Sequence, residues 1–100
     1  MSLEINKKQE GSTLVFALKG SLDTLTSPDL QAELDKGFDG VDELIFDFSD
    51  LTYISSSGLR TMLYAWKAMR EKGQMKIIHV SEILHEVFEV TGLTELLTIE

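Results

Sequence analysis

Three consecutive serines, Ser55, Ser56 and Ser57, precede Gly58 at the point where an apolar segment gives way to a helical pattern. A serine hydroxyl at the start of a helix can accept a hydrogen bond from one of the free N–H groups there. It can also act as a nucleophile, or accept a phosphoryl group whose negative charge a helix N-terminus favours. One helix cap needs a single hydroxyl, and this segment has three. Gly58 in addition lets the backbone come close to a ligand or partner. The triplet therefore indicates more than a cap.

A nucleophilic serine needs a base, usually a histidine that a third group orients. The chain holds two histidines, His79 and His85, and it lacks a Gly-x-Ser-x-Gly motif. We expect both histidines to be structural or surface residues, and the protein not to be an enzyme. A small hydrolase or phosphoryl-transfer enzyme that uses Ser55 or Ser56 remains an alternative. It needs His79 or a carboxylate within hydrogen-bond reach of the hydroxyl.

The composition argues against several other kinds of site. The chain has no cysteine, P-loop or Gly-x-Gly-x-x-Gly motif, and no cluster of histidines and carboxylates with metal-ligand spacing. We therefore expect no metal and no cofactor. Seventeen acidic and nine basic residues leave a formal net charge of −8, which repels nucleic acid and anionic membranes. A basic protein partner would suit this surface, although solubility alone also explains the charge.

The length of 100 residues is that of one domain, and we expect a single domain over residues 1–100. The N-terminus lacks the basic and apolar regions of a signal peptide. No apolar run approaches the roughly 18 residues of a membrane span. These features predict a cytoplasmic location.

Hydrophobic periodicity predicts the elements that position the serines, in the order hairpin, helix, strand, helix, strand, helix and short tail. The first half is predicted to hold strands over Leu3–Asn6 and Leu14–Leu18 around a polar turn Lys7–Ser12, then a helix from Pro28 with Ser27 as its cap and Leu30, Leu34 and Phe38 as its stripe, and a strand over 43–48. The second half is predicted to hold a helix over 59–70, a strand over Met75–Val80, and a helix after Ser81 that has Ile83, Leu84, Val87 and Phe88 on one face and ends at Gly92. The tail Leu93–Ile99 forms an edge strand or a docked turn.

This alternation is typical of an α/β fold with a mixed, mostly parallel sheet of about four to five strands. The loops after the strands that end near Leu18, Phe48 and Val80 then emerge at one edge of the sheet, where ligands and partners bind. Within those strands Asp47 is the one charge of an apolar run, so it needs solvent or a hydrogen-bond partner. The residues expected at the shared edge are Asp23, Thr24, Asp50, the three serines and Ser81.

Asp23 has two interpretations. Its side chain can stabilise the turn between Leu22 and Ser27, since Asp commonly hydrogen-bonds the backbone of a turn. It can also belong to the partner-facing edge.

Four segments together resemble the anti-sigma factor antagonists of the STAS domain family, over nearly the whole chain. They are Gly20-x-Leu22-Asp23, Asp47-Phe48-Ser49, Ile54-x-Ser56-Ser57-Gly58-Leu59 and Gly92-Leu93. The resemblance implies helices packed on one face of a mixed sheet. It also implies bacterial partner switching, in which the unphosphorylated protein binds an anti-sigma factor that is also a serine kinase and so frees a sigma factor. Phosphorylation by that kinase ends the binding, and a phosphatase reverses it.

Matched onto this chain, the resemblance makes Ser56 the phosphate acceptor, with Ser57 and Gly58 completing the motif and Asp23 near it. The family's common Asp before the acceptor is Ser55 here, so the local negative charge is smaller and a second hydroxyl lies beside the target. We expect a monomer or weak dimer. The residues expected to bind the partner are Asp23, Thr24, Ser55, Ser56, Ser57 and Gly58.

Two further alternatives stay within the same family. In one, the domain is a constitutive scaffold of a signalling assembly and Ser56 is never phosphorylated. In the other, the domain is the regulatory domain of an anion transporter. The starting Met and the lack of a membrane span disfavour this second alternative.

Overall fold

The computed structural model describes residues 2–100, so Met1 of the expected domain lies outside it. A five-stranded sheet has the order β1-β2-β3-β4-β5, with β1 antiparallel to β2 and the other neighbours parallel. The predicted α/β fold with a mixed, mostly parallel sheet is confirmed. The elements are β1 (Leu3–Glu10), β2 (Thr13–Leu22), α1 (Ser27–Leu34), β3 (Glu43–Ile54), α2 (Ser56–Met69), β4 (Gln74–Ile78), α3 (Glu82–Val90), the 3₁₀ turn η1 (Leu93–Glu95) and β5 (Thr98–Ile99).

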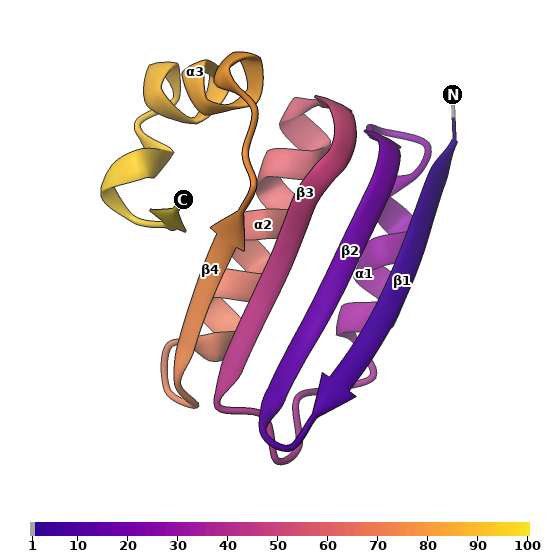
Figure 1. Ribbon diagram of the computed structural model, residues 1–100, viewed down its shortest axis with the longest axis vertical. Helices are drawn as coiled ribbons and strands as arrows, with labels where there is room; N and C mark the ends of the chain where they lie inside the picture. Colours follow the sequence, from indigo (N-terminus) through magenta and orange to yellow (C-terminus); the bar gives the residue numbers. More distant parts are fainter. Residues whose placement is uncertain (1) are drawn as a thin grey trace.

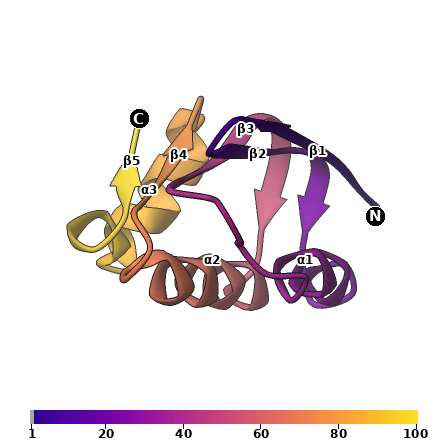
Figure 2. The same ribbon diagram turned by 90° about the horizontal axis from the view of Figure 1, so that it is seen from below.

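Helices α1 and α2 lie side by side against one face of the sheet (Figure 2), and α3 lies near the carboxyl end of β4 (Figure 1). Alternation from Thr13 to Leu18 in β2 and from Glu43 to Phe48 in β3 buries every second side chain between the sheet and these helices. The rings of Phe16 and Phe46 stack there, with 5.7 Å between their centroids. The fully buried centre of the core includes Leu14, Phe16, Leu18, Leu44, Phe46, Phe48, Met62 and Met69.

The opening hairpin is longer than its sequence predicts, and the predicted turn over Lys7–Ser12 is wrong. Strand β1 continues to Glu10, and the chain reverses only at Gly11 and Ser12, where Gly11 has a φ of 60°. The polar segment stays extended because its residues pair in register with β2, from Lys7 opposite Phe16 to Glu10 opposite Thr13. Polar side chains on an exposed edge strand do not disturb such pairing.

Strand β3 also extends further than predicted, to Ile54 instead of Phe48. Its second half continues the parallel ladder with β2, which itself runs to Leu22, through two register irregularities. Buried Leu51 and Ile54 anchor this half to the core. Asp50 therefore pairs with Lys19 inside the sheet, and the prediction that it lies in an edge loop is wrong.

The first helix begins at Ser27, one residue before the predicted start at Pro28. Thr26 occupies the N-cap position and Ser27 is already helical. The helix ends at Leu34, so Phe38 lies beyond it, although Phe38 is still buried in the core.

The predicted strand over Met75–Val80 stops at Ile78, because His79 adopts a left-handed backbone with a φ of 58°. The long central helix begins at Ser56, ahead of the predicted 59, and ends within a residue of the predicted position. The tail forms both of its predicted alternatives, the turn η1 and the short edge strand β5.

The last helix is capped by Ser81, as predicted, but it does not bury the whole predicted stripe. Leu84 and Phe88 face the core, and the Phe88 ring lies 6.3 Å from that of Phe48. Ile83, predicted to share one apolar face with Leu84 and Phe88, is 74% exposed, and Val87 is only partly buried. The helix therefore turns one apolar side toward solvent.

Candidate functional site

The three serines have three different surroundings. Ser55 is the N-cap of α2, and its Oγ accepts a hydrogen bond from the Gly58 N–H at 3.4 Å. The Ser57 Oγ lies 3.3 Å from the Thr24 hydroxyl and accepts a bond from the Arg60 guanidinium at 3.2 Å. Ser56 is exposed, and within residues 2–100 its hydroxyl makes no hydrogen bond. Of the triplet, only Ser56 thus presents an unengaged hydroxyl at the surface.

The ends of two strands hold this helix start in place. Strand β3 leads into Ser55, whose N–H donates to the Leu22 carbonyl of β2 at 2.9 Å. Gly58 is buried against both strand ends. A Cβ added there would lie 2.7 Å from Ile54 Cγ1 and 2.8 Å from the Leu22 carbonyl oxygen. Glycine is therefore needed for α2 to begin this close to the sheet, and its role in the structure is helix packing.

Asp23 organises the loop that faces the serines, as its turn interpretation predicts. Its Oδ1 accepts bonds from the N–H groups of Thr26 and Leu25, each at 3.0 Å, and from the Thr26 hydroxyl at 3.2 Å. The Thr26 N–H, helped by the Leu25 N–H and the Thr26 hydroxyl, holds the pKa of Asp23 below its usual value. The loop thereby presents Thr24 to Ser57.

Two residues of this edge escaped the sequence analysis. Leu25, between two threonines at the tip of the loop, is 81% exposed. Arg60 lies one helical turn after Ser56 and bonds Ser57. A shallow pocket of about 360 Å³ lies between the starts of α1 and α2, with Thr24, Ser57 and Arg60 in its wall. An apolar residue inside a polar turn was the only sequence signal for Leu25, and Arg60 gave none beyond its spacing.

The histidines are engaged elsewhere. His79 Nδ1 lies 3.0 Å from Asp47 Oδ1, and that oxygen also accepts the Ser49 N–H at 2.9 Å. Partial burial raises the pKa of Asp47, but the bonds from Ser49 and His79 outweigh it and leave the pKa below its usual value. His85 bonds Glu89 at 2.8 Å.

Asp47 and Ser56 are separated by the remaining length of β3. At about 3.3 Å per residue, the strand from Asp47 to Ile54 places the His79 pair roughly 20 Å from the serines. Within residues 2–100, no hydrogen bond joins a histidine or a carboxylate to the hydroxyl of Ser55 or Ser56, so the base that the serine hydrolase alternative requires is not in place. Within residues 2–100 no group of three or more His, Asp or Glu side chains could hold a metal ion.

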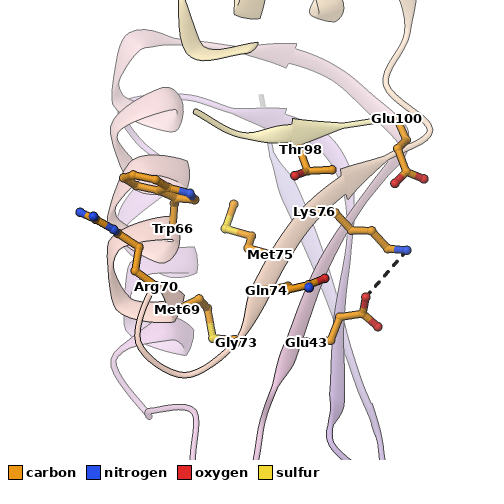
Figure 3. A pocket seen from close by; sticks show the side chains of 10 residues that line it. All are labelled: Glu43, Trp66, Met69, Arg70, Gly73, Gln74, Met75, Lys76, Thr98 and Glu100. Atoms are coloured by element: carbon orange, nitrogen blue, oxygen red, sulfur yellow. Dashed lines mark ion pairs between the residues drawn. The ribbon is translucent and has the colours of Figure 1, made fainter. Parts of the chain in front are cut away.

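A second pocket, of about 330 Å³, lies at the other end of α2, beside the start of β4. There the Arg70 guanidinium lies 4.8 Å from the centre of the Trp66 ring, and Lys76 pairs with Glu43 at 3.8 Å (Figure 3). Because α2 has 14 residues and rises about 1.5 Å per residue, this pocket is about 20 Å from Ser56. It takes no part in the serine site.

Among the described helices, none has the length and apolar character that crossing a bilayer requires.

Comparison with known proteins agrees with this arrangement. The family model of the STAS domain matches residues 4–100. The chain is 33% identical over 81 residues to BtrV of Bordetella bronchiseptica, named as a candidate anti-sigma factor antagonist, covering 79% of this chain and 70% of that protein. It is 26% identical over 102 residues to the anti-sigma F factor antagonist of Paenibacillus polymyxa, covering 99% and 87%.

A solved structure has the same fold. The Bacillus cell fate determinant SpoIIAA, in its phosphorylated form, superposes with a TM-score of 0.76 at 21% identity, covering 97% of this chain and 91% of that one. The family model, the relatives and the fold agree over almost the whole length. The chain therefore belongs to the STAS domain family.

Proposed function

We propose that this protein is an anti-sigma factor antagonist that works by partner switching. The unphosphorylated form binds an anti-sigma factor that is a serine kinase and so frees a sigma factor. Phosphorylation of Ser56 blocks that binding, and a phosphatase restores it. The observation that carries the proposal is the exposed hydroxyl of Ser56, which makes no hydrogen bond within residues 2–100 and lies between two serines whose hydroxyls are engaged. The proposed contact surface comprises Asp23, Thr24, Ser55, Ser56, Ser57 and Gly58.

A phosphate at this position can act without refolding the domain. It adds about 1.5 to 2 negative charges, and the N-terminus of α2, with its free N–H groups, favours an anion. At a packed interface the same group adds bulk and a charge that must be desolvated. A penalty of roughly 3 kcal/mol weakens binding more than 100-fold, because about 1.4 kcal/mol corresponds to a factor of ten.

Ser55 stands where the family commonly has an Asp before the acceptor, and a capping role that both residues can fill supports the proposal despite this exchange. Capping requires a side-chain oxygen that accepts an N–H bond, which Ser and Asp both provide. Ser55 performs this role toward Gly58. We infer that Ser56 is the acceptor although a hydroxyl stands on either side of it, because the other two are already bonded.

Relatives support the proposal without testing it on this chain. Two similar proteins are named as antagonists of anti-sigma factors, and the similar SpoIIAA structure was solved in a phosphorylated form. A cognate kinase and phosphatase are therefore the partners that we propose.

The test combines capture with intact mass. Wild-type, Ser56→Ala and Ser56→Asp proteins are used as baits in a lysate of the native cell, and Ser55→Ala and Ser57→Ala serve as matched neighbours. The proposal predicts that a kinase-type ATPase is recovered with every bait except Ser56→Asp, and that only the Ser56 variants fail to gain one phosphate. Equal recovery by all baits with no phosphate on any of them would instead support the constitutive scaffold.

A further inference from the structure

The outer side of α3 carries an apolar stripe whose two ends, Ile83 and Val90, no other part of residues 2–100 covers. Ile83 is 74% and Val90 86% exposed, and partly buried Val87 lies between them. The spacing i, i+4, i+7 places all three on one side of the helix, within roughly 60° of arc. Leu84 and Phe88, on the adjacent side, make the contacts with the core. Leu96, just after η1, is a further exposed apolar residue in this region, at 50%.

The same region is strongly acidic. From Ile77 to Glu100 the chain has five glutamates and no lysine or arginine, so most of the net charge of −8 is concentrated there. By helical periodicity, Glu82, Glu86 and Glu89 lie along the side of the stripe that faces away from the core. Glu89 is paired with His85, but Glu82 and Glu86 form no ion pair within residues 2–100.

Charge decides between the possible occupants of this stripe. A second copy of the chain would bring two acidic rows together, and like charges at an interface are destabilising. Anionic lipid and nucleic acid are repelled for the same reason. A helix with an apolar face and flanking Lys or Arg side chains satisfies both features, because it covers the stripe and neutralises the free glutamates.

We propose that α3 is a docking surface for a basic amphipathic helix of a protein partner. The partner helix lies along α3, its apolar residues contact Ile83, Val87 and Val90, and its cations face Glu82 and Glu86. Amphipathic helices commonly bind protein partners in this way, with apolar side chains at helical spacing packed against a hydrophobic surface of the partner. The surface belongs to a different element from Ser56, and the proposal does not depend on phosphorylation.

The probe is a synthetic helical peptide of about 18 residues with leucines on one face and lysines beside them. A scrambled peptide of equal composition, without an apolar face, is the control. Amide chemical shifts of the ¹⁵N-labelled protein map the site, and fluorescence anisotropy gives the dissociation constant. We expect shifts confined to α3 and η1, and binding by the amphipathic peptide at least about tenfold tighter than by the scrambled one.

Two matched pairs of variants separate the contributions. Ile83→Ser with Val90→Ser should weaken binding about tenfold or more, whereas Leu25→Ser, at an equally exposed site, should not. Glu82→Gln with Glu86→Gln should weaken binding and reduce its salt dependence. The same charge change at Glu4 and Glu71, two exposed residues away from α3, should leave it unchanged. Circular dichroism checks that every variant is folded.

Any one of the following results would overturn the inference. The scrambled peptide could bind as tightly as the amphipathic one, the shifts could spread over all acidic surfaces, or the Ile83 and Val90 variant could bind unchanged. Sedimentation could also show that the wild type is a dimer and that the Ile83 and Val90 variant is a monomer. The stripe would then bind a second copy of the chain instead. Repeating the titration with Ser56→Asp keeps this test separate from the partner switch, because the inference predicts no effect of that change.

Discussion

The hydroxyl of Ser57 lies 3.3 Å from that of Thr24, although 33 residues separate them in sequence. This contact joins the start of α2 to the loop after β2. It brings the serine triplet and the Asp23 loop into one surface at the carboxyl edge of the sheet, where open α/β folds place their binding sites. Ser56 lies beside this contact, but within residues 2–100 its hydroxyl makes no hydrogen bond. The proposed switch depends on this difference between the hydroxyls of Ser56 and Ser57.

Gly58 should be intolerant of a side chain. Gly58→Ala places a methyl group within 3 Å of Ile54 and the Leu22 backbone, and overpacking of this kind destabilises by about 1 to 3 kcal/mol. The free energy of unfolding in urea measures the effect, with Ser57→Ala in the same helical turn as the control. Equal stability of Gly58→Ala and wild type would show that α2 can shift to make room.

Asp23 should act through the loop that it organises. Asp23→Ala leaves the N–H groups of Leu25 and Thr26 without their acceptor, so both amides should exchange with solvent faster and partner binding should weaken. Asp23→Asn keeps a side-chain oxygen at the same position and should restore slow exchange. If both variants exchange like wild type, the loop is held by other contacts.

Asp47 should make stability depend on pH in the acid range. The pKa of Asp47 is lowered in the folded protein, so the unfolded chain binds the proton of this carboxyl more readily. The stabilisation that the Asp47 carboxylate gives is therefore present above its unfolded pKa of about 3.9. It is lost as the pH falls through the folded pKa. The difference in unfolding free energy between wild type and Asp47→Asn should shrink as the pH falls below about 5. A difference that does not change down to the acid transition would contradict this role.

The orientation of α3 predicts opposite results for neighbouring residues. Leu84→Ala removes a buried side chain and should destabilise the fold by about 2 to 4 kcal/mol. Ile83→Ser, next to it but exposed, should change stability by less than about 0.5 kcal/mol. Thermal unfolding of the two variants tests this directly. Equal losses would mean that Ile83 is packed in solution.

The sequence predicted the order of elements, the mixed sheet and the capping of α2 and α3, because these depend on local periodicity and on hydroxyls at helix starts. It did not predict the second half of β3. Thr52 and Tyr53 give that segment no alternating pattern, and its long-range pairing with Lys19–Leu22, together with the burial of Leu51 and Ile54, keeps it extended. It also grouped Ile83 with Leu84 and Phe88 on one apolar face, since periodicity does not show which part of a broad apolar face packs against the core.

Local sequence likewise left the three serines equivalent. Their separation into a cap, a free hydroxyl and a bonded hydroxyl depends on Thr24 and Arg60, and the Thr24 contact is made only by folding. The motif resemblance selected Ser56, and the geometry now supplies a physical reason for that choice.

The most direct test of the proposed switch is the affinity of the captured anti-sigma factor for protein phosphorylated on Ser56, measured by calorimetry against the unmodified protein. The account predicts binding weakened more than about 100-fold, with unchanged circular dichroism and with Ser56→Ala still binding like wild type. Equal affinity of the phosphorylated and unmodified proteins would contradict it.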